Sequence, residues 1–242
     1  MNAIGVIPAR FFSTRFEGKV LANLLGKPMI QHVWENAKKA NLLDELVIAC
    51  DDERIEKKAR EFGADVILTS KDHLSGTDRL TEIVQPLDVN VVVNIQADEP
   101  LLHFSMIDDM VRLLLDDPSI IMATVIKRIE NRGEISDPNM VKVVIDRDDF
   151  ALYFSRSPIP YLNVDCQEVT CYKHIGLYAY SKDFLFTFRN LPESKLEKME
   201  KLEQLRVLEA GFKIKTVQTK FETIGVDTPQ DLQKVEEKIR GF

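Results

Sequence analysis

Three cationic side chains follow the first apolar segment of the chain. Residues 4–7 form a short apolar run that is typical of a buried strand, and Arg10, Arg15 and Lys19 come soon after it. In an open α/β sheet, ligands collect beyond the carboxyl ends of the strands, where arginine and lysine can match phosphate oxygens. Gly18 lets the backbone approach a ligand closely. The pattern favours a polyphosphate site, and the alternative is a solvated charged loop.

Two aspartates stand where a metal ion would be useful. Asp98 follows the β-branched run 89–96, the most strongly apolar segment of the chain, and a carboxylate there would face the ligand crevice. Magnesium prefers hard oxygen ligands and often takes one or two protein carboxylates plus substrate oxygens. Asp227 immediately precedes a predicted helix. It is either a helix-entry residue or a second metal ligand, and Asp98 is either a ligand or part of an ordinary turn.

A third polar segment, 72–79, leads into a helix and is dense in hydrogen-bonding groups. Ser75, Gly76 and Arg79 lie in it. Such a loop can contact a base or a ribose. The structural alternative is helix capping by Thr77 with solvated neighbours.

Composition limits the class of protein. The chain has 242 residues, 45% hydrophobic and 29% charged, which is enough to bury a large core. The net charge of −7 argues against general nucleic-acid binding, and no apolar run reaches membrane-spanning length. Without a signal-peptide pattern, we expect a cytoplasmic protein that needs no membrane.

Three cysteines at wide spacing predict free thiols. An odd count, Cys50, Cys166 and Cys171, does not suit a disulfide framework. A zinc site that combines Cys166, Cys171 and His174 lacks a fourth ligand, so we set it aside.

Strand and helix signals alternate through the first half, which predicts a mostly parallel sheet with helices on both faces. Strands are predicted at 45–50, 64–69 and 89–96, and helices from Pro28 and from Asp51.

The alternation of strand and helix signals ends after residue 120. Strands at 141–145 and 150–154 predict an antiparallel excursion. The segment 194–210 reads as one helix opened by a capping box, with Leu196, Met199, Leu202 and Leu205 as its buried stripe. The last strand is predicted at 213–219 and a final helix from Thr228.

Seven segments then occur in a recognisable order. They are PARFFSTRFEGK, DHLSGTDR, VNIQADEP, FSRSPIP, KHIGLYAY, LEQLR and GVDTP. From end to end, the chain resembles the CMP-Kdo synthetases, which are 3-deoxy-manno-octulosonate (Kdo) cytidylyltransferases. The resemblance implies a Mg²⁺-dependent cytoplasmic homodimer that transfers CMP from CTP to the anomeric hydroxyl of this acidic eight-carbon sugar. Pyrophosphate is released, and the product serves lipopolysaccharide biosynthesis.

The resemblance also implies an organisation and a set of site residues. One Rossmann-like nucleotidyltransferase domain would span 1–242, with 1–118 mainly binding CTP and 119–242 mainly binding sugar and forming the dimer. The nucleotide-binding residues would be Arg10, Ser13, Arg15, Lys19, Ser75, Gly76 and Arg79. The sugar-binding residues would be Gln96, Arg156, His174, Tyr178, Glu203 and Gln204. Lys19, Asp98 and Asp227 would be catalytic, with the two aspartates on magnesium.

Local chemistry leaves other readings open for two of the sugar residues. His174 lies in an apolar run, where a histidine is often a satisfied core group. Glu203 falls on the predicted buried helix face, where a structural salt bridge would also explain it.

Three residues depart from the family pattern. Glu17 and Val20 stand where prolines are usual, and Ala97 stands where glycine is usual. Glu17 would weaken nucleotide affinity or pair with Lys19. The alternatives to Kdo transfer are a cytidylyltransferase for the 8-amino analogue of Kdo, a silent CTP-binding regulatory module, and a neuraminic-acid-type enzyme, whose first loop should look different.

Overall fold

The computed structural model describes residues 1–12, 16–73, 75–161 and 170–241. The strands are β1 Ala3–Ala9, β2 Asn23–Leu24, β3 Lys27–Pro28, β4 Glu45–Cys50, β5 Asp65–Leu68, β6 Val91–Asn94, β7 Met122–Arg128, β8 Lys142–Ile145, β9 Ala151–Ser155, β10 Tyr172–Ser181 and β11 Lys215–Thr219. The α-helices are α1 Met29–Ala37, α2 Glu53–Glu61, α3 Gly76–Val84, α4 Phe104–Asp116, α5 Lys182–Asn190, α6 Lys195–Glu200, α7 Leu205–Glu209 and α8 Pro229–Arg240. Two short 3₁₀ helices are η1 Lys19–Leu21 and η2 Arg132–Ser136.

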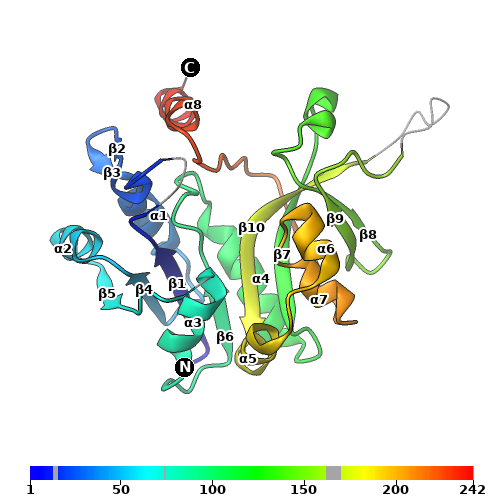
Figure 1. Cartoon of the computed structure of the whole chain (residues 1–242), viewed down its shortest axis with the longest axis horizontal. Coiled ribbons are helices and arrows are strands. Elements are labelled where there is room, and N and C mark those ends of the chain that lie inside the picture. The colour runs from blue at the N-terminus through cyan, green and yellow to red at the C-terminus, as the bar shows by residue number, and fades with distance from the viewer. Residues whose placement is uncertain (13–15, 74, 162–169, 242) are drawn as a thin grey trace.

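One large sheet organises the molecule. Its main path runs β11-β7-β10-β6-β1-β4-β5, and the pairs β1–β4, β1–β6, β4–β5 and β11–β7 are parallel (Figure 1). The apolar run that predicted a central strand forms β6, which lies between β1 and β10. The mostly parallel α/β class predicted from the sequence is confirmed.

The antiparallel excursion is also confirmed. Strand β10 runs antiparallel to β6, β7 and β8, and β8 pairs antiparallel with β9. Its register on β7 shifts between Ile175 and Tyr178, next to Gly176. The excursion therefore starts from a strand inserted between two strands of the main sheet.

Helices cover both faces of the sheet. One apolar core packs side chains of α1, α2 and α4 against it, including Trp34, Ile55 and Met106. The core on the other face takes side chains from α3, α5 and α7, including Leu80 and Phe188. Burial of this apolar surface is the main favourable term that holds the sheet and helices together.

The single helix predicted over 194–210 is wrong. The chain forms α6 and α7 with a break between them, because Lys201 adopts a left-handed conformation with φ of 55°. Of the predicted buried stripe, Leu202 and Leu205 are buried, whereas Met199 is 79% exposed. The break places Glu203 and Gln204 in a turn instead of on a helix face.

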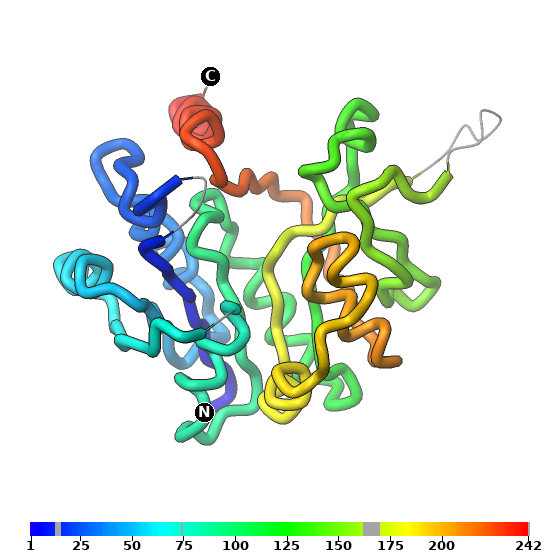
Figure 2. Tube along the Cα trace, viewed as in Figure 1, coloured from blue at the N-terminus to red at the C-terminus, as the bar shows by residue number. Residues whose placement is uncertain are grey.

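The last helix crosses back to the first half of the chain. Residues 220–228, called the linker here, lead from β11 to α8 (Figures 1 and 2). Val226 and Val235 pack with Leu24 and Met29 in a small third core. The functional division near residue 118 stays a prediction, and in space α8 belongs with the first half.

Two further expectations can be checked against the described residues. Cys50 and Cys171 are free, as predicted, and both are buried, whereas Cys166 lies outside the described residues. Among the described helices, none is both long enough and apolar enough to cross a membrane.

The third core makes α8 sensitive to one substitution. Val235 is fully buried, so Val235→Asp should release α8, because a carboxylate cannot be buried there without a partner. Tryptic cleavage at Lys234 and Lys238 should become about tenfold faster or more, as expected when a helix opens locally. The exposed Gln233→Asp is the matched control, and equal cleavage rates for both variants would contradict this packing.

Candidate active site

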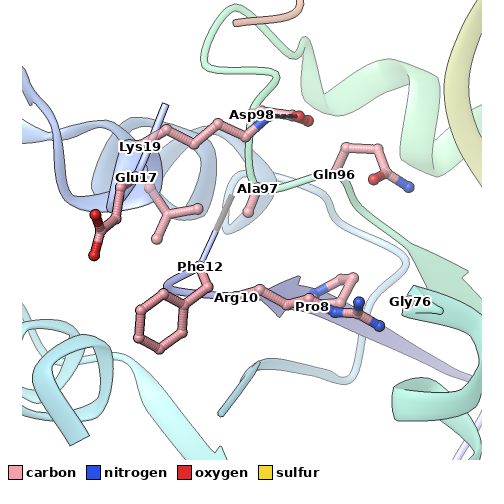
Figure 3. Close-up of a pocket in the computed structure, with 10 residues that line it drawn as sticks. Pro8, Arg10, Phe12, Glu17, Lys19, Gly76, Gln96, Ala97 and Asp98 are labelled. Carbon is pink, nitrogen blue, oxygen red and sulfur yellow. Dashed lines mark hydrogen bonds and ion pairs between the residues drawn. The ribbon is translucent and has the colours of Figure 1, made fainter. Parts of the chain in front are cut away.

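An ion cluster joins three distant parts of the chain. The Nζ of Lys19 lies 2.6 Å from Oδ2 of Asp98 and 3.1 Å from Oδ1 of Asp227. It also donates to the carbonyl oxygen of Val226 at 3.1 Å. Lys19 begins η1 directly after Gly18, whose φ of 65° lets the chain turn there, and Asp98 follows β6. Figure 3 shows the Lys19 side chain extended toward Asp98.

Opposing effects act on the Lys19 ammonium. Burial lowers its pKa, and the charges and hydrogen bonds of Asp98 and Asp227 raise it. The carboxylates outweigh burial, so the pKa of Lys19 lies above its ordinary value. The ammonium therefore stays charged and serves as the cation between two carboxylates.

The linker that carries Asp227 is anchored to the sheet by charge and by backbone bonds. Glu222 forms ion pairs with Lys127 at 3.1 Å and with Lys173, and both lysines are buried. Further along, the amide of Val226 donates to the carbonyl oxygen of Asp98 at 2.9 Å. These contacts hold Asp227 near the end of β6, although the linker forms neither helix nor strand.

A cavity of about 580 Å³, called the loop cavity, opens beside the first loop (Figure 3). It is lined by Pro8, Arg10, Phe12, Glu17, Lys19, Val20, Gly76, Gln96, Ala97 and Asp98. Five residues predicted from the sequence thus meet around one space: Arg10, Lys19, Gly76, Gln96 and Asp98. Ser13 and Arg15, predicted to bind phosphates, lie outside the described residues.

A second cavity of about 610 Å³, called the linker cavity, lies between the linker and the antiparallel strands. Asp98, Asp227, His174 and Lys173 are among the residues that line it. Because Asp98 lines both cavities, the two spaces adjoin at the ion cluster.

His174 is held as a neutral imidazole. Its Nε2 lies 2.9 Å from Oγ1 of Thr124, which also hydrogen-bonds to the carbonyl oxygen of Leu177 at 2.9 Å. The hydroxyl has one proton and donates it to that carbonyl, so Nε2–H donates to the hydroxyl. Burial lowers the pKa of His174 to about 3. The ring lies 5.3 Å from that of Tyr178, whose pKa burial raises well above its usual value.

The helix break presents two more predicted sugar residues. Glu203 accepts a hydrogen bond of 3.0 Å from Oγ1 of Thr77, and both line a third cavity, of about 660 Å³, together with Ser75. Burial raises the pKa of the Glu203 carboxyl. Nε2 of Gln204 is buried without a hydrogen-bond partner in the part of the chain that the structure describes.

Two arginines that were predicted to bind substrates are hydrogen-bonded to other residues of the protein. Arg79 is fully buried and bonds to Thr69 and, at 3.2 Å, to Asp51. Arg156 donates to the carbonyl oxygens of Glu200 at 2.8 Å and Pro138 at 3.0 Å. In this conformation both guanidinium groups are engaged by the protein.

The sequence suggested Thr77 as the cap of helix α3, and the structure shows a different cap. Ser75 is the N-cap, and it forms a capping box with Asp78. Gly76 is the first helical residue, so its backbone lies at a helix N-terminus that faces the loop cavity.

Sequence reasoning missed one acidic residue of the site. Oε2 of Glu99 is buried without a hydrogen-bond partner among the described residues. Burial raises the pKa of Glu99 to about 8, and the charge of Asp98 adds to the rise. The adjacent pair Asp98-Glu99 was the available signal, because two neighbouring carboxylates at a strand end rarely share one role.

Glu17 does not pair with Lys19, because Lys19 is taken by Asp98 and Asp227. It lines the loop cavity instead.

The mostly parallel sheet with its antiparallel excursion is the fold of nucleotidyltransferases of known structure. The structure of 4-diphosphocytidyl-2C-methyl-D-erythritol synthase from Anaerococcus prevotii shares this fold, with a TM-score of 0.66 at 12% identity, covering 99% of this chain and 98% of that chain. The family model described as "Cytidylyltransferase" matches residues 4–217.

The particular family follows from full-length relatives. The chain is 49% identical over 252 residues to the 3-deoxy-manno-octulosonate cytidylyltransferase of Geobacter metallireducens, covering 100% of this chain and 99% of the relative. It is 51% identical to that of Pelobacter propionicus, with the same coverage. A structure of CMP:2-keto-3-deoxy-manno-octonic acid synthetase complexed with CTP matches with a TM-score of 0.93 at 41% identity and covers 99% of each chain. The chain belongs to the 3-deoxy-manno-octulosonate cytidylyltransferase family.

The neutral state of His174 can be measured. With its pKa at about 3, the ring should show no titration in NMR spectra between about pH 5 and pH 8, where an ordinary histidine titrates. The low pKa of His174 also makes the folding stability of the protein depend on pH. Below the ordinary histidine pKa the unfolded chain gains a proton that the folded ring refuses, so folding stability falls as the pH drops. A titration midpoint inside that range would contradict the buried, neutral assignment.

Proposed function

We propose that the chain transfers CMP from CTP to the anomeric hydroxyl of 3-deoxy-manno-octulosonate and releases pyrophosphate. The observation that carries the proposal is the meeting of two cavities at Asp98, one lined by Arg10 and Lys19 and the other by His174 and Asp227. The loop cavity suits the triphosphate, and the linker cavity suits the acceptor. Family membership supports the same pair of substrates.

The reaction is an in-line displacement. The oxygen of the anomeric hydroxyl bonds to the α-phosphorus of CTP, the bond to the bridging oxygen of pyrophosphate breaks, and the hydroxyl proton is released. No covalent intermediate with the protein is needed. The work of the protein is positioning and charge stabilisation.

The residues of the loop cavity have separable tasks. Arg10 offers forked donors to phosphate oxygens, and it is oriented by the bond from its Nη2 to the carbonyl oxygen of His73 at 2.8 Å. Lys19 contributes a mobile charge that can turn from the carboxylates to a phosphate. The first turn of α3, beginning at Gly76, adds backbone amides.

The acceptor side uses neutral hydrogen-bonding groups. Nδ1 of His174 remains an acceptor because Nε2 carries the proton, so it can take a hydrogen bond from a sugar hydroxyl. Tyr178 stays protonated, and Gln96 and Gln204 offer amides. For Arg156, turning toward the sugar carboxylate would require giving up two backbone partners.

Magnesium fits the donor set. The carboxylates of Asp98 and Asp227 already share one cation, the Lys19 ammonium, and both are hard oxygen ligands. Among the described residues, no group of three or more histidine, cysteine, aspartate or glutamate side chains is arranged to hold a metal. Two carboxylates plus substrate phosphates are a common Mg²⁺ ligand set. Asp98 and Asp227 would hold the ion, which would offset charge at the reacting phosphate.

The proposal extends to assembly and location. Strand β9 is an edge strand, and Leu152 on it, Tyr161 beyond it and Met199 on α6 are 60%, 92% and 79% exposed. A second copy of the chain would cover such side chains in a homodimer. We place the activity in the cytoplasm, where it would supply the activated sugar for lipopolysaccharide.

Pyrophosphate release tests the function. Purified protein with CTP, Mg²⁺ and Kdo should release pyrophosphate and form CMP-Kdo, identified by mass. Asp98→Asn should lower turnover about 100-fold or more, the scale of losing one electrostatic group at a reacting centre. Asp116→Asn, an exposed aspartate at the end of α4, is the control that should keep full activity.

Three outcomes would contradict the proposal. Turnover with the 8-amino analogue but not with Kdo would reassign the acceptor. CTP binding without turnover on either sugar would favour a regulatory module. Full activity in Asp98→Asn would remove Asp98 from the site.

A further inference from the structure

We propose that Arg54 is a positioning residue for the CTP site, acting through a stack on Phe11 that holds the two ends of the first loop together. The inference rests on the proposed function, because it assigns a role in nucleotide binding. Arg54 lies in the first turn of α2, far in sequence from the loop and outside the residues that line either cavity of the proposed site.

The guanidinium group is stacked and fixed. Its central carbon lies 3.4 Å from the centroid of the Phe11 ring, a close contact with the π face. Asp52 holds it from the side, with Nε and Nη2 each 2.7 Å from a carboxylate oxygen. These two hydrogen bonds fix the orientation of the guanidinium group over the Phe11 ring.

Phe11 in turn joins the two ends of the loop through a backbone hydrogen bond. Its carbonyl oxygen accepts a hydrogen bond of 2.9 Å from the amide of Gly18, and its own amide donates to Oδ1 of Asp51 at 3.1 Å. A Cβ at position 18 would lie 3.2 Å from the ring atom Cζ, and the φ of Gly18 is 65°. Glycine at position 18 avoids both the strain of this φ and a tight contact with the ring that Arg54 covers.

In the sequence, Phe11 and Gly18 lie between two cations that line the loop cavity. Arg10 immediately precedes Phe11, and Lys19 immediately follows Gly18. Fixing Phe11 against Gly18 therefore fixes the two backbone points from which Arg10 and Lys19 enter the loop cavity. Without the stack, the same cations would have to be ordered when the triphosphate binds, and CTP would bind more weakly.

The charge of Glu17 also acts on Arg54. The hydrogen bonds that Arg54 donates to Asp52 raise the pKa of Arg54, and the charge of Glu17 adds to the rise. The charge of Glu17 and the ring of Phe11 link the loop to the same helix residue.

A double-mutant cycle tests the proposal on the full-length protein. Arg54→Ala and Phe11→Leu should each raise the KM for CTP about fivefold, the size expected for losing one cation–π contact. The value of kcat and the KM for the sugar should stay within about twofold, because neither residue contacts the reacting groups. The double variant should be no weaker than either single one, because both remove the same contact.

Two further variants separate stacking from charge and from folding. Arg54→Lys keeps the charge but cannot both fork to Asp52 and lie flat on the ring, so it should behave like Arg54→Ala. Arg60→Ala, on the same helix and paired with Glu56, is the matched control and should leave the KM for CTP unchanged. Urea melts of each variant confirm that the protein is folded under assay conditions.

The results that overturn the inference differ from those that overturn the function. If the wild-type protein turns over and Arg54→Ala keeps its KM for CTP, the stack has no positioning role. A double variant weakened about 25-fold, the product of the single effects, would show that Arg54 and Phe11 act independently. Absence of wild-type turnover would reject the function, and calorimetric CTP binding to the same variants would still test the stack.

Discussion

The Lys19 ammonium lies between the carboxylates of Asp98 and Asp227, and the rest of the site is arranged around this ion cluster. Its three members come from the first loop, the end of the central strand β6 and the linker before α8. The sheet places the first two side by side, because β1 and β6 are parallel neighbours whose carboxyl ends meet at one edge. Asp227 depends on longer-range anchors, namely the ion pairs of Glu222 and the packing of α8.

This cluster connects stability with chemistry. Carboxylates as close as Asp98 and Asp227 repel each other, and in the structure the Lys19 ammonium between them supplies the cation that offsets this repulsion. In the proposed reaction the nucleotide introduces phosphate charge, so Lys19 gains a competing partner and the carboxylates become available to a metal ion. A lysine suits this exchange because its charge is a mobile point on a flexible stem. The Arg54 stack keeps the loop that carries Lys19 in place during such an exchange.

The features that sequence predicted are those with local signals. The apolar run at β6, the start of α2 just after Asp51 and the antiparallel strands β8 and β9 each depend on neighbouring residues, and all three were predicted. The break at Lys201 was missed because neither glycine nor proline marks the residue that adopts the left-handed backbone. Arg79 was predicted beside the nucleotide from its place in a polar loop. Its burial against Asp51 and Thr69 depends on contacts from β4 and β5 that no local pattern reveals.

The most direct test of the ion cluster is Mn²⁺ binding, measured by electron paramagnetic resonance on the protein without nucleotide. If Lys19 serves as the cation for Asp98 and Asp227, Lys19→Gln should bind Mn²⁺ about tenfold more tightly than the wild-type protein, since removing a competing charge of this kind is worth about 1.4 kcal/mol. Adding Asp98→Asn to that variant should abolish the gain. Equal or weaker binding by Lys19→Gln would contradict the account.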